Sequence, residues 1–147
     1  MNASEQAINL DFASKIATVV RIFKGCLPDL KADLKPWASD QDTQALVDPD
    51  SIDIGFHFPG VSRVFHCRSL LVQIRLYRDP VEATHRVIGL EVAGFDHRGK
   101  QWNLSTIEHW QFTGNEPAAT AGQQVKQCCR QVLELFNSSI NSRSEDN

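Results

Sequence analysis

The stretch from 86 to 112, RVIGLEVAGFDHRGKQWNLSTIEHWQF, constrains the fold of this chain more than any other segment. Apolar residues recur at every second position on both sides of a turn. Leu90 and Val92 do so before the turn, and Trp102 and Leu104 do so after it. A period of two is typical of β-strands, which send alternate side chains to one face. The pattern therefore predicts a long β-hairpin.

The turn of this hairpin predicts how its two strands, 86–95 and 101–112, pair. Asp96 can accept a backbone hydrogen bond, and Gly99 can adopt the left-handed conformation that ends a type I turn with a bulge. A shift of one residue would send every apolar side chain to solvent, so the register should be well defined. The expected cross-strand pairs are Phe95 with Gln101, Val92 with Leu104, and Leu90 with Thr106.

Apolar stripes with helical spacing predict one helix near each end of the chain. The first spans 4–24, where Ser4 can cap its start and Gly25 can end it. The second spans 117–139, with Asn115 as its N-cap. The first stripe consists of Ile8, Phe12, Ile16, Val19, Val20 and Phe23, and the second of Val125, Cys128, Val132, Phe136 and Ile140.

The segment between the first helix and the hairpin contains further strands. Residues 26–50 are punctuated by prolines and allow a helical turn at 29–34. Strands are predicted at 52–58, 61–67 and 69–77. We therefore expect an α+β fold, with an N-terminal helix, a four- to five-stranded antiparallel meander and a C-terminal helix. Both helices should cover one face of the sheet. The expected organisation is a single domain over 1–140 and a disordered tail over 141–147.

Composition argues against several classes of protein. The net charge of −3 is mild, whereas nonspecific nucleic-acid binding usually needs a strongly basic domain. No apolar run approaches the roughly 20 residues of a membrane span. The polar N-terminal segment does not resemble a secretory signal. The four cysteines, which form no CxxC pattern, indicate reduced thiols in a cytoplasmic protein. They are Cys26, Cys67, Cys128 and Cys129.

Three side chains form a candidate ligand-binding site. His57 and His109 fall on the polar face of their predicted strands, which they could share with Glu91. A histidine that faces a carboxylate can bind a metal or transfer a proton. The alternative is that these histidines are scattered over a polar face. The sequence favours the alternative because the spacing is not diagnostic while the strand order is unknown, so neither a metal nor a cofactor is expected.

Two cysteine patterns are weaker candidates for chemistry. Cys67 follows His66, but neighbours on a strand point to opposite faces and cannot form a thiolate–imidazole pair. Cys67 is therefore expected to be buried. Cys128 falls in the apolar stripe of the last helix. Cys129 lies about 100° further round and is expected to be partly exposed.

The aspartate-rich segment 40–53 resembles a calcium-binding loop only in composition. An EF-hand loop needs glycine at its sixth position and glutamate at its twelfth. Counted from Asp40, these positions hold Ala45 and Ser51. Counted from Asp48, they hold Asp53 and Pro59, so both frames fail. The segment is predicted to be a solvated loop.

Arginine and tryptophan supply the candidate interface. Arginines are frequent in the predicted strands, where they can bind anionic groups or cover apolar surface with their stems. Trp37 follows a proline in a polar segment and either caps the core or anchors a partner. The predicted interface consists of Trp37, Arg75 and Asn103.

These features favour a non-enzymatic interaction protein that forms a homodimer. Lysine is absent between residues 36 and 99, although exposed sheet surfaces usually carry lysine to prevent self-association. The alternative is a small-molecule-binding domain or small enzyme, with His57, Glu91 and His109 in a pocket between sheet and helices. Single-stranded nucleic-acid binding by the sheet is a third hypothesis, which the acidic net charge disfavours.

Overall fold

A computed structural model describes residues 1–38 and 47–145 of the chain, with side chains up to residue 138. All strands of the described part form one antiparallel sheet in the order β1-β2-β3-β4-β5-β6, so that each strand pairs with the next along the chain. The α+β class is confirmed, with six strands rather than four to five. The elements are α1 (Ala3–Gln6), α2 (Leu10–Cys26), β1 (Lys31–Asp33), β2 (Ser51–Ser62), β3 (Cys67–Arg78), β4 (His85–Asp96), β5 (Gly99–Ser105), β6 (Gln111–Gly114) and α4 (Ala119–Glu145).

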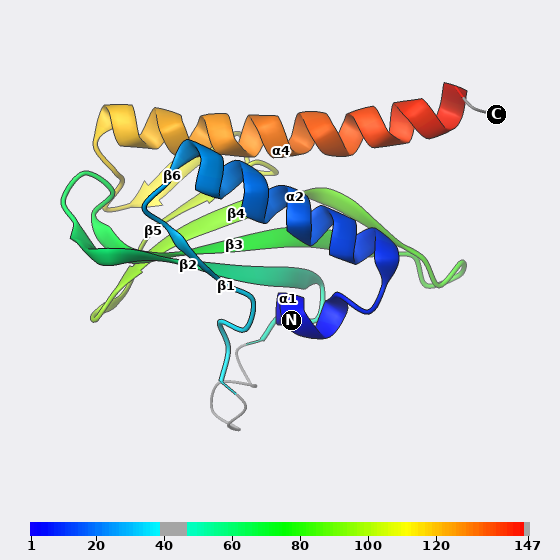
Figure 1. Ribbon diagram of the computed structural model, residues 1–147, viewed down its shortest axis with the longest axis horizontal. Coiled ribbons are helices and arrows are strands. Elements are labelled where there is room, and N and C mark those ends of the chain that lie inside the picture. Colours follow the sequence, from blue (N-terminus) through cyan, green and yellow to red (C-terminus); the bar gives the residue numbers. More distant parts are fainter. Residues whose placement is uncertain (39–46, 146–147) are drawn as a thin grey trace.

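Helices α2 and α4 lie across one face of the sheet, as the sequence predicts, while the short α1 lies beside β2 (Figure 1). The core fills the layer between these helices and the sheet. Its side chains come from alternate positions of the strands and from one stripe on each helix. The predicted core set of Ile16, Leu90, Val92, Leu104 and Phe136 is buried within this single cluster.

The central hairpin forms largely as predicted. Val92 pairs with Leu104, and the Thr106 amide donates to the Leu90 carbonyl at 3.0 Å. The predicted pairing of Phe95 with Gln101 is wrong, because an irregularity after Gly94 shifts the register and pairs Phe95 with Lys100. The turn itself matches the prediction. Gly99 has a φ of +108°, and the Asp96 carboxylate accepts a hydrogen bond from the Arg98 amide at 2.7 Å.

The predicted strand over 101–112 is instead two strands, β5 and β6, separated by a turn. The Ser105 hydroxyl accepts hydrogen bonds from the backbone amides of Ile107 and Glu108, which folds the chain back. His109 and Trp110 both have positive φ, 66° and 58°. This turn also leaves Trp110 only half-buried.

Two further predictions for the first half of the sheet are wrong. Residues 61–67 do not form a separate strand, because β2 continues to Ser62, whose hydroxyl accepts from the Phe65 amide in the turn before β3. Residues 29–34 do not form a helical turn, because Lys31–Asp33 is the edge strand β1 and pairs with β2.

The terminal helices differ from their predicted boundaries. The predicted helix over 4–24 is divided into α1 and α2 because Asn9 caps α2, its side-chain oxygen accepting from the Phe12 amide at 3.1 Å. Ile8 consequently lies outside the stripe and is 94% exposed. Helix α4 begins at Ala119 and continues to Glu145, past the predicted end at residue 139. The division into one domain and a tail stays a prediction.

Each helix of the described part is too short or too polar to cross a lipid bilayer.

Candidate functional site: the uncovered face of the sheet

The face of the sheet opposite α2 and α4 carries no helix among the described residues (Figure 1). We call it the uncovered face. Paired residues of neighbouring antiparallel strands share a face, so its side chains form rows across the sheet. The first row is His57, Ser69, Phe95 and Lys100; the second is Gly55, Leu71, Ala93 and Asn103; and the third is Asp53, Gln73, Glu91 and Ser105.

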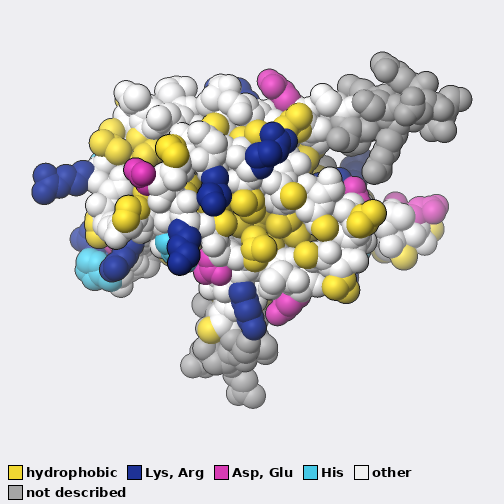
Figure 2. Space-filling model, viewed as in Figure 1, with side chains coloured by type: hydrophobic (Ala, Val, Ile, Leu, Met, Phe, Trp, Pro, Cys, Tyr) yellow, Lys and Arg dark blue, Asp and Glu magenta, His cyan; other side chains and the backbone are white. Residues whose placement is uncertain are grey.

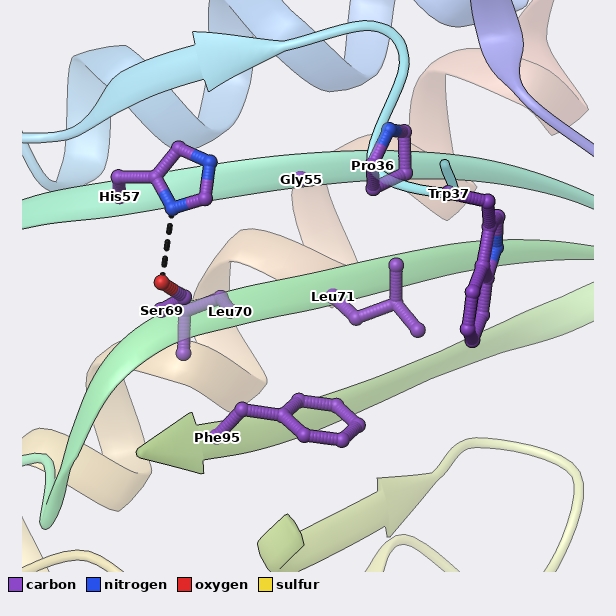
Figure 3. Close-up of a pocket in the computed structure, with 8 residues that line it drawn as sticks. All are labelled: Pro36, Trp37, Gly55, His57, Ser69, Leu70, Leu71 and Phe95. Carbon is purple, nitrogen blue, oxygen red and sulfur yellow. Dashed lines mark hydrogen bonds between the residues drawn. The ribbon is translucent and has the colours of Figure 1, made fainter. Parts of the chain in front are cut away.

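A hollow of about 180 Å³ lies over the first two rows. Leu71 and Phe95 form its apolar floor, and the Pro36–Trp37 segment that follows β1 forms one wall (Figure 3). Gly55 allows this segment to approach the sheet. A Cβ atom at that position would lie 3.2 Å from the Cβ of Pro36. The hollow therefore depends on the glycine in β2 and on the aromatic wall above it.

Trp37 is held in place by Asp53, whose side chain is fully buried. The indole Nε1 of Trp37 donates to Asp53 Oδ2 at 2.5 Å. Ser51 Oγ, at 2.6 Å, and Gln73 Nε2, at 3.2 Å, donate to the other carboxylate oxygen. The amino group of Met1 lies 3.0 Å from Oδ2. A buried carboxylate persists only when it is paired and hydrogen-bonded, and these four donors fix the Trp37 wall to the sheet.

His57 forms the polar rim of the hollow. Its Nδ1 lies 2.7 Å from Ser69 Oγ (Figure 3), and its Nε2 lies 3.0 Å from Asp33 Oδ2. Burial raises the pKa of Asp33, but hydrogen bonds from His57 and from the Lys35 amide outweigh that effect, so the pKa of this carboxyl lies below its usual range. An ionised Asp33 favours a proton on Nε2, and Ser69 then donates to Nδ1.

The order serine, histidine, aspartate resembles a nucleophile, a base and a carboxylate. Acyl transfer also needs hydrogen-bond donors aimed at the developing oxyanion. Ser69 lies inside the sheet, paired with His57 on one side and Phe95 on the other. Backbone amides in such a ladder bond to neighbouring strands and are not free for a substrate. The arrangement supports hydrogen bonding to a partner better than catalysis.

Arg75, another charged side chain of the uncovered face, is paired within the chain. Arg75 Nη1 lies 2.8 Å from Asp48 Oδ2. Burial raises the pKa of Asp48, but the hydrogen bonds from the Asp50 amide and Arg75 outweigh that effect. The pKa is lowered overall, so this carboxylate is ionised at neutral pH. With His57 bonded to Asp33 and Asp53 bonded to its donors, the remaining charged side chains of the three rows are Glu91 and Lys100, which form no ion pair within the described residues. Lys100 Nζ lies 6.0 Å from the Phe95 ring centre.

The structure separates the three residues of the predicted ligand-binding site. His57 lines the hollow, and Glu91 lies on the same face, two strands away and four residues along, which is about 16 Å. His109 lies in the exposed turn between β5 and β6. In contrast, all three residues of the predicted interface, Trp37, Arg75 and Asn103, belong to the uncovered face.

The cysteines are buried or half-buried free thiols. Cys67 is buried, as predicted. Burial raises the pKa of both Cys67 and Cys129 to about 12. It also raises the pKa of Cys128. The prediction that Cys129 is partly exposed is wrong, because both residues of the pair pack in the core. Within the described ranges, no three histidine, cysteine or acidic side chains are grouped to hold a metal.

The sequence left several site residues unidentified. Asp33 was missed because no strand was predicted within the irregular segment 26–50, and without β1 His57 has no carboxylate partner. Ser69 and Leu71 alternate with the core residues of β3, so their parity could have placed them on the face of His57 once the turn before β3 was recognised. The buried position of Asp53 depends on contacts with Met1 and Trp37, which are distant in sequence.

Residues 4–138 match the model of a family described as a domain of unknown function. Comparisons with curated proteins and with solved structures gave no match.

Proposed function

We propose that this chain, a member of that family of domains of unknown function, is a non-enzymatic interaction protein. Its uncovered face binds a second copy of the chain. The observation that carries this proposal is the hollow beside Trp37 and Phe95. Small-molecule pockets usually occupy about 300–1,000 Å³. The hollow holds about 180 Å³, which suits a single apolar side chain of a partner protein better than a cofactor or substrate.

The extent of the face supports a protein partner. Strands β2, β3 and β4 are each 12 residues long, and at about 3.3 Å per residue they reach about 40 Å. Strands β1, β5 and β6 are shorter, with 3, 7 and 4 residues, and neighbouring strands lie about 4.8 Å apart. The footprint of the six strands is therefore on the order of 800 Å², about the area that each partner contributes to a standard interface.

The chemistry of the face supports a second copy as that partner. The centres of interfaces are depleted in unpaired charge and enriched in aromatic residues. Trp37 and Phe95 flank the hollow, and the ion pair with Asp48 neutralises Arg75. In a two-fold dimer the same surface supplies both the hollow and the side chain that enters it. We place this dimer in the cytoplasm, which the four free thiols support.

Energy transfer between two labelled pools of the protein tests the proposal. Cys26 is the one partly exposed thiol among the four and lies on α2, away from the uncovered face. Donor-labelled and acceptor-labelled copies should exchange subunits and give energy transfer on mixing. Phe95→Lys should abolish the transfer because it places a charge in the apolar interface.

Val64→Lys is the matched control, since Val64 is also apolar and 53% exposed but lies in the turn before β3. It should leave the transfer unchanged. Equal transfer in the wild type and Phe95→Lys, or equal loss in both variants, would contradict the uncovered face as the interface.

A further inference from the structure

Two charged side chains of the uncovered face, Glu91 and Lys100, form no ion pair within the described residues. Glu91 lies in the third row, between the polar side chains Gln73 and Ser105 of the neighbouring strands. Lys100 lies in the first row, beside Phe95, which lines the hollow. The face therefore presents two charges of opposite sign that its own strands leave unpaired.

The two charges lie too far apart to pair within one chain. Lys100 pairs with Phe95, which is four residues from Glu91 along β4. One strand spacing and four residues correspond to about 14 Å between the two Cα atoms. An ion pair needs a nitrogen and an oxygen atom within about 4 Å of each other, and side chains that stand perpendicular to the sheet do not cross this distance. Each charge is therefore available to a second molecule.

A two-fold dimer can pair both charges through a single kind of contact. In such an interface, residue i contacts residue j of the partner, and residue j contacts residue i. Placing Glu91 against the partner's Lys100 therefore creates two equivalent ion pairs. We propose that these two reciprocal ion pairs set the register in which two uncovered faces meet. This inference rests on the proposed dimer and adds the contact that orients it, because complementary charges fix register and disfavour misaligned partners.

The residues between the two charges suit this register. The two-fold axis passes midway between the charges, where Ala93 and Asn103 pair in the second row. Residues beside a two-fold axis meet their own copies. The amide of Asn103 holds both donors and an acceptor, so it can bond to its own copy, and the short side chain of Ala93 lets the two sheets approach. At the usual strand spacings, the same axis places the partner's Phe95 next to Leu71 on the floor of the hollow.

The opposite side of the molecule has a different distribution of charge and supplies matched controls. Lysine, arginine and acidic side chains are scattered over the side that carries the helices (Figure 2), as is typical of a surface that stays in solvent. On α4, Lys126 Nζ lies 5.6 Å from the Phe112 ring centre, an arrangement like that of Lys100. Glu134 is an exposed carboxylate on the same helix. Reversing either of these charges leaves the uncovered face unchanged.

Charge-reversal variants, alone and mixed, test the proposal by sedimentation equilibrium. Glu91→Lys alone should raise the dimer dissociation constant at least about tenfold, because each dimer then sets lysine against lysine at two places. Lys100→Glu alone should do the same with carboxylates. An equimolar mixture of the two variants should form heterodimers about as tightly as the wild type, because every lysine at these positions then meets a carboxylate of the other chain.

Three controls isolate the register. Glu134→Lys and Lys126→Glu should each dimerise like the wild type. So should Lys31→Glu, which changes the lysine opposite His57 on the edge strand β1. A mixture no tighter than its single variants, or equal weakening by Lys31→Glu and Lys100→Glu, would overturn the register while the wild type remained a dimer. A monomeric wild type would contradict the proposed function itself, and the register with it.

Discussion

At the scale of single residues, the buried carboxylate of Asp53 organises the uncovered face. It joins the start of the chain, the aromatic wall and the sheet through bonds to Met1, Trp37 and Gln73. A charge in this position is costly unless every donor is present. The wall of the hollow therefore depends on a residue that does not itself line it.

Replacing Asp53 by asparagine should lower the free energy of unfolding by about 3 kcal/mol. The amide keeps the shape of the side chain but turns one acceptor into a donor that faces the Trp37 indole or the Ser51 hydroxyl. A buried donor is then left without an acceptor, which costs free energy. Urea denaturation measures the loss. Asp50→Asn, at a partly exposed carboxylate nearby, should change stability by less than about 0.5 kcal/mol. Equal effects of the two substitutions would show that the four bonds to Asp53 contribute little.

At the scale of secondary-structure elements, the sequence predicted the parts whose pattern is local. The period of two located the core strands and paired Val92 with Leu104, because one face of those strands is buried. Strand β1 carries no such signal, since a three-residue edge strand is defined by its partner β2. Without β1 the contact between Asp33 and His57 could not be predicted either. The β5–β6 turn was missed because Trp110 and Phe112 continue the alternation that β5 begins.

The close packing of β4 on β5 gives a test at this scale. Gly94 pairs with Trp102, and a Cβ atom at Gly94 would collide with the indole ring. The ring is held in place because its Nε1 donates to the Phe65 carbonyl at 2.7 Å. Gly94→Ala should therefore destabilise the protein by about 1–3 kcal/mol through overpacking. Gly60→Ala has open space around the new methyl group and should change the melting behaviour little. An unchanged stability in Gly94→Ala would mean that the indole has room to move.

At the scale of the whole molecule, the sheet separates two surfaces of different character. The helix side contains a groove of about 620 Å³ beside Phe12 and Phe136, and the uncovered face contains the small hollow beside Trp37. The sequence predicted the two layers from amphipathic stripes. It did not predict the size of either cavity, because cavity size depends on where α2 and α4 separate and on how the segment after β1 crosses Gly55.

Thiol reactivity reports on the layer between the helices and the sheet. In the native protein Ellman's reagent should react with Cys26 alone, because the other three thiols are buried. Burial also raises the pKa of Cys67 and Cys129 to about 12, so few of these thiols are ionised at neutral pH. Unfolding in denaturant should release all four. Cys26→Ser should remove the native reaction. A count below four in the unfolded protein would indicate a disulfide and contradict the proposed cytoplasmic location.

Sedimentation equilibrium of the wild-type protein at micromolar concentration tests the central claim most directly. The uncovered face has the area and the aromatic content of an interface, so the fitted mass should be about twice the chain mass of 16.5 kDa. Phe95→Lys should return the mass to that of one chain. A wild-type mass of 16.5 kDa throughout the micromolar range would contradict the homodimer.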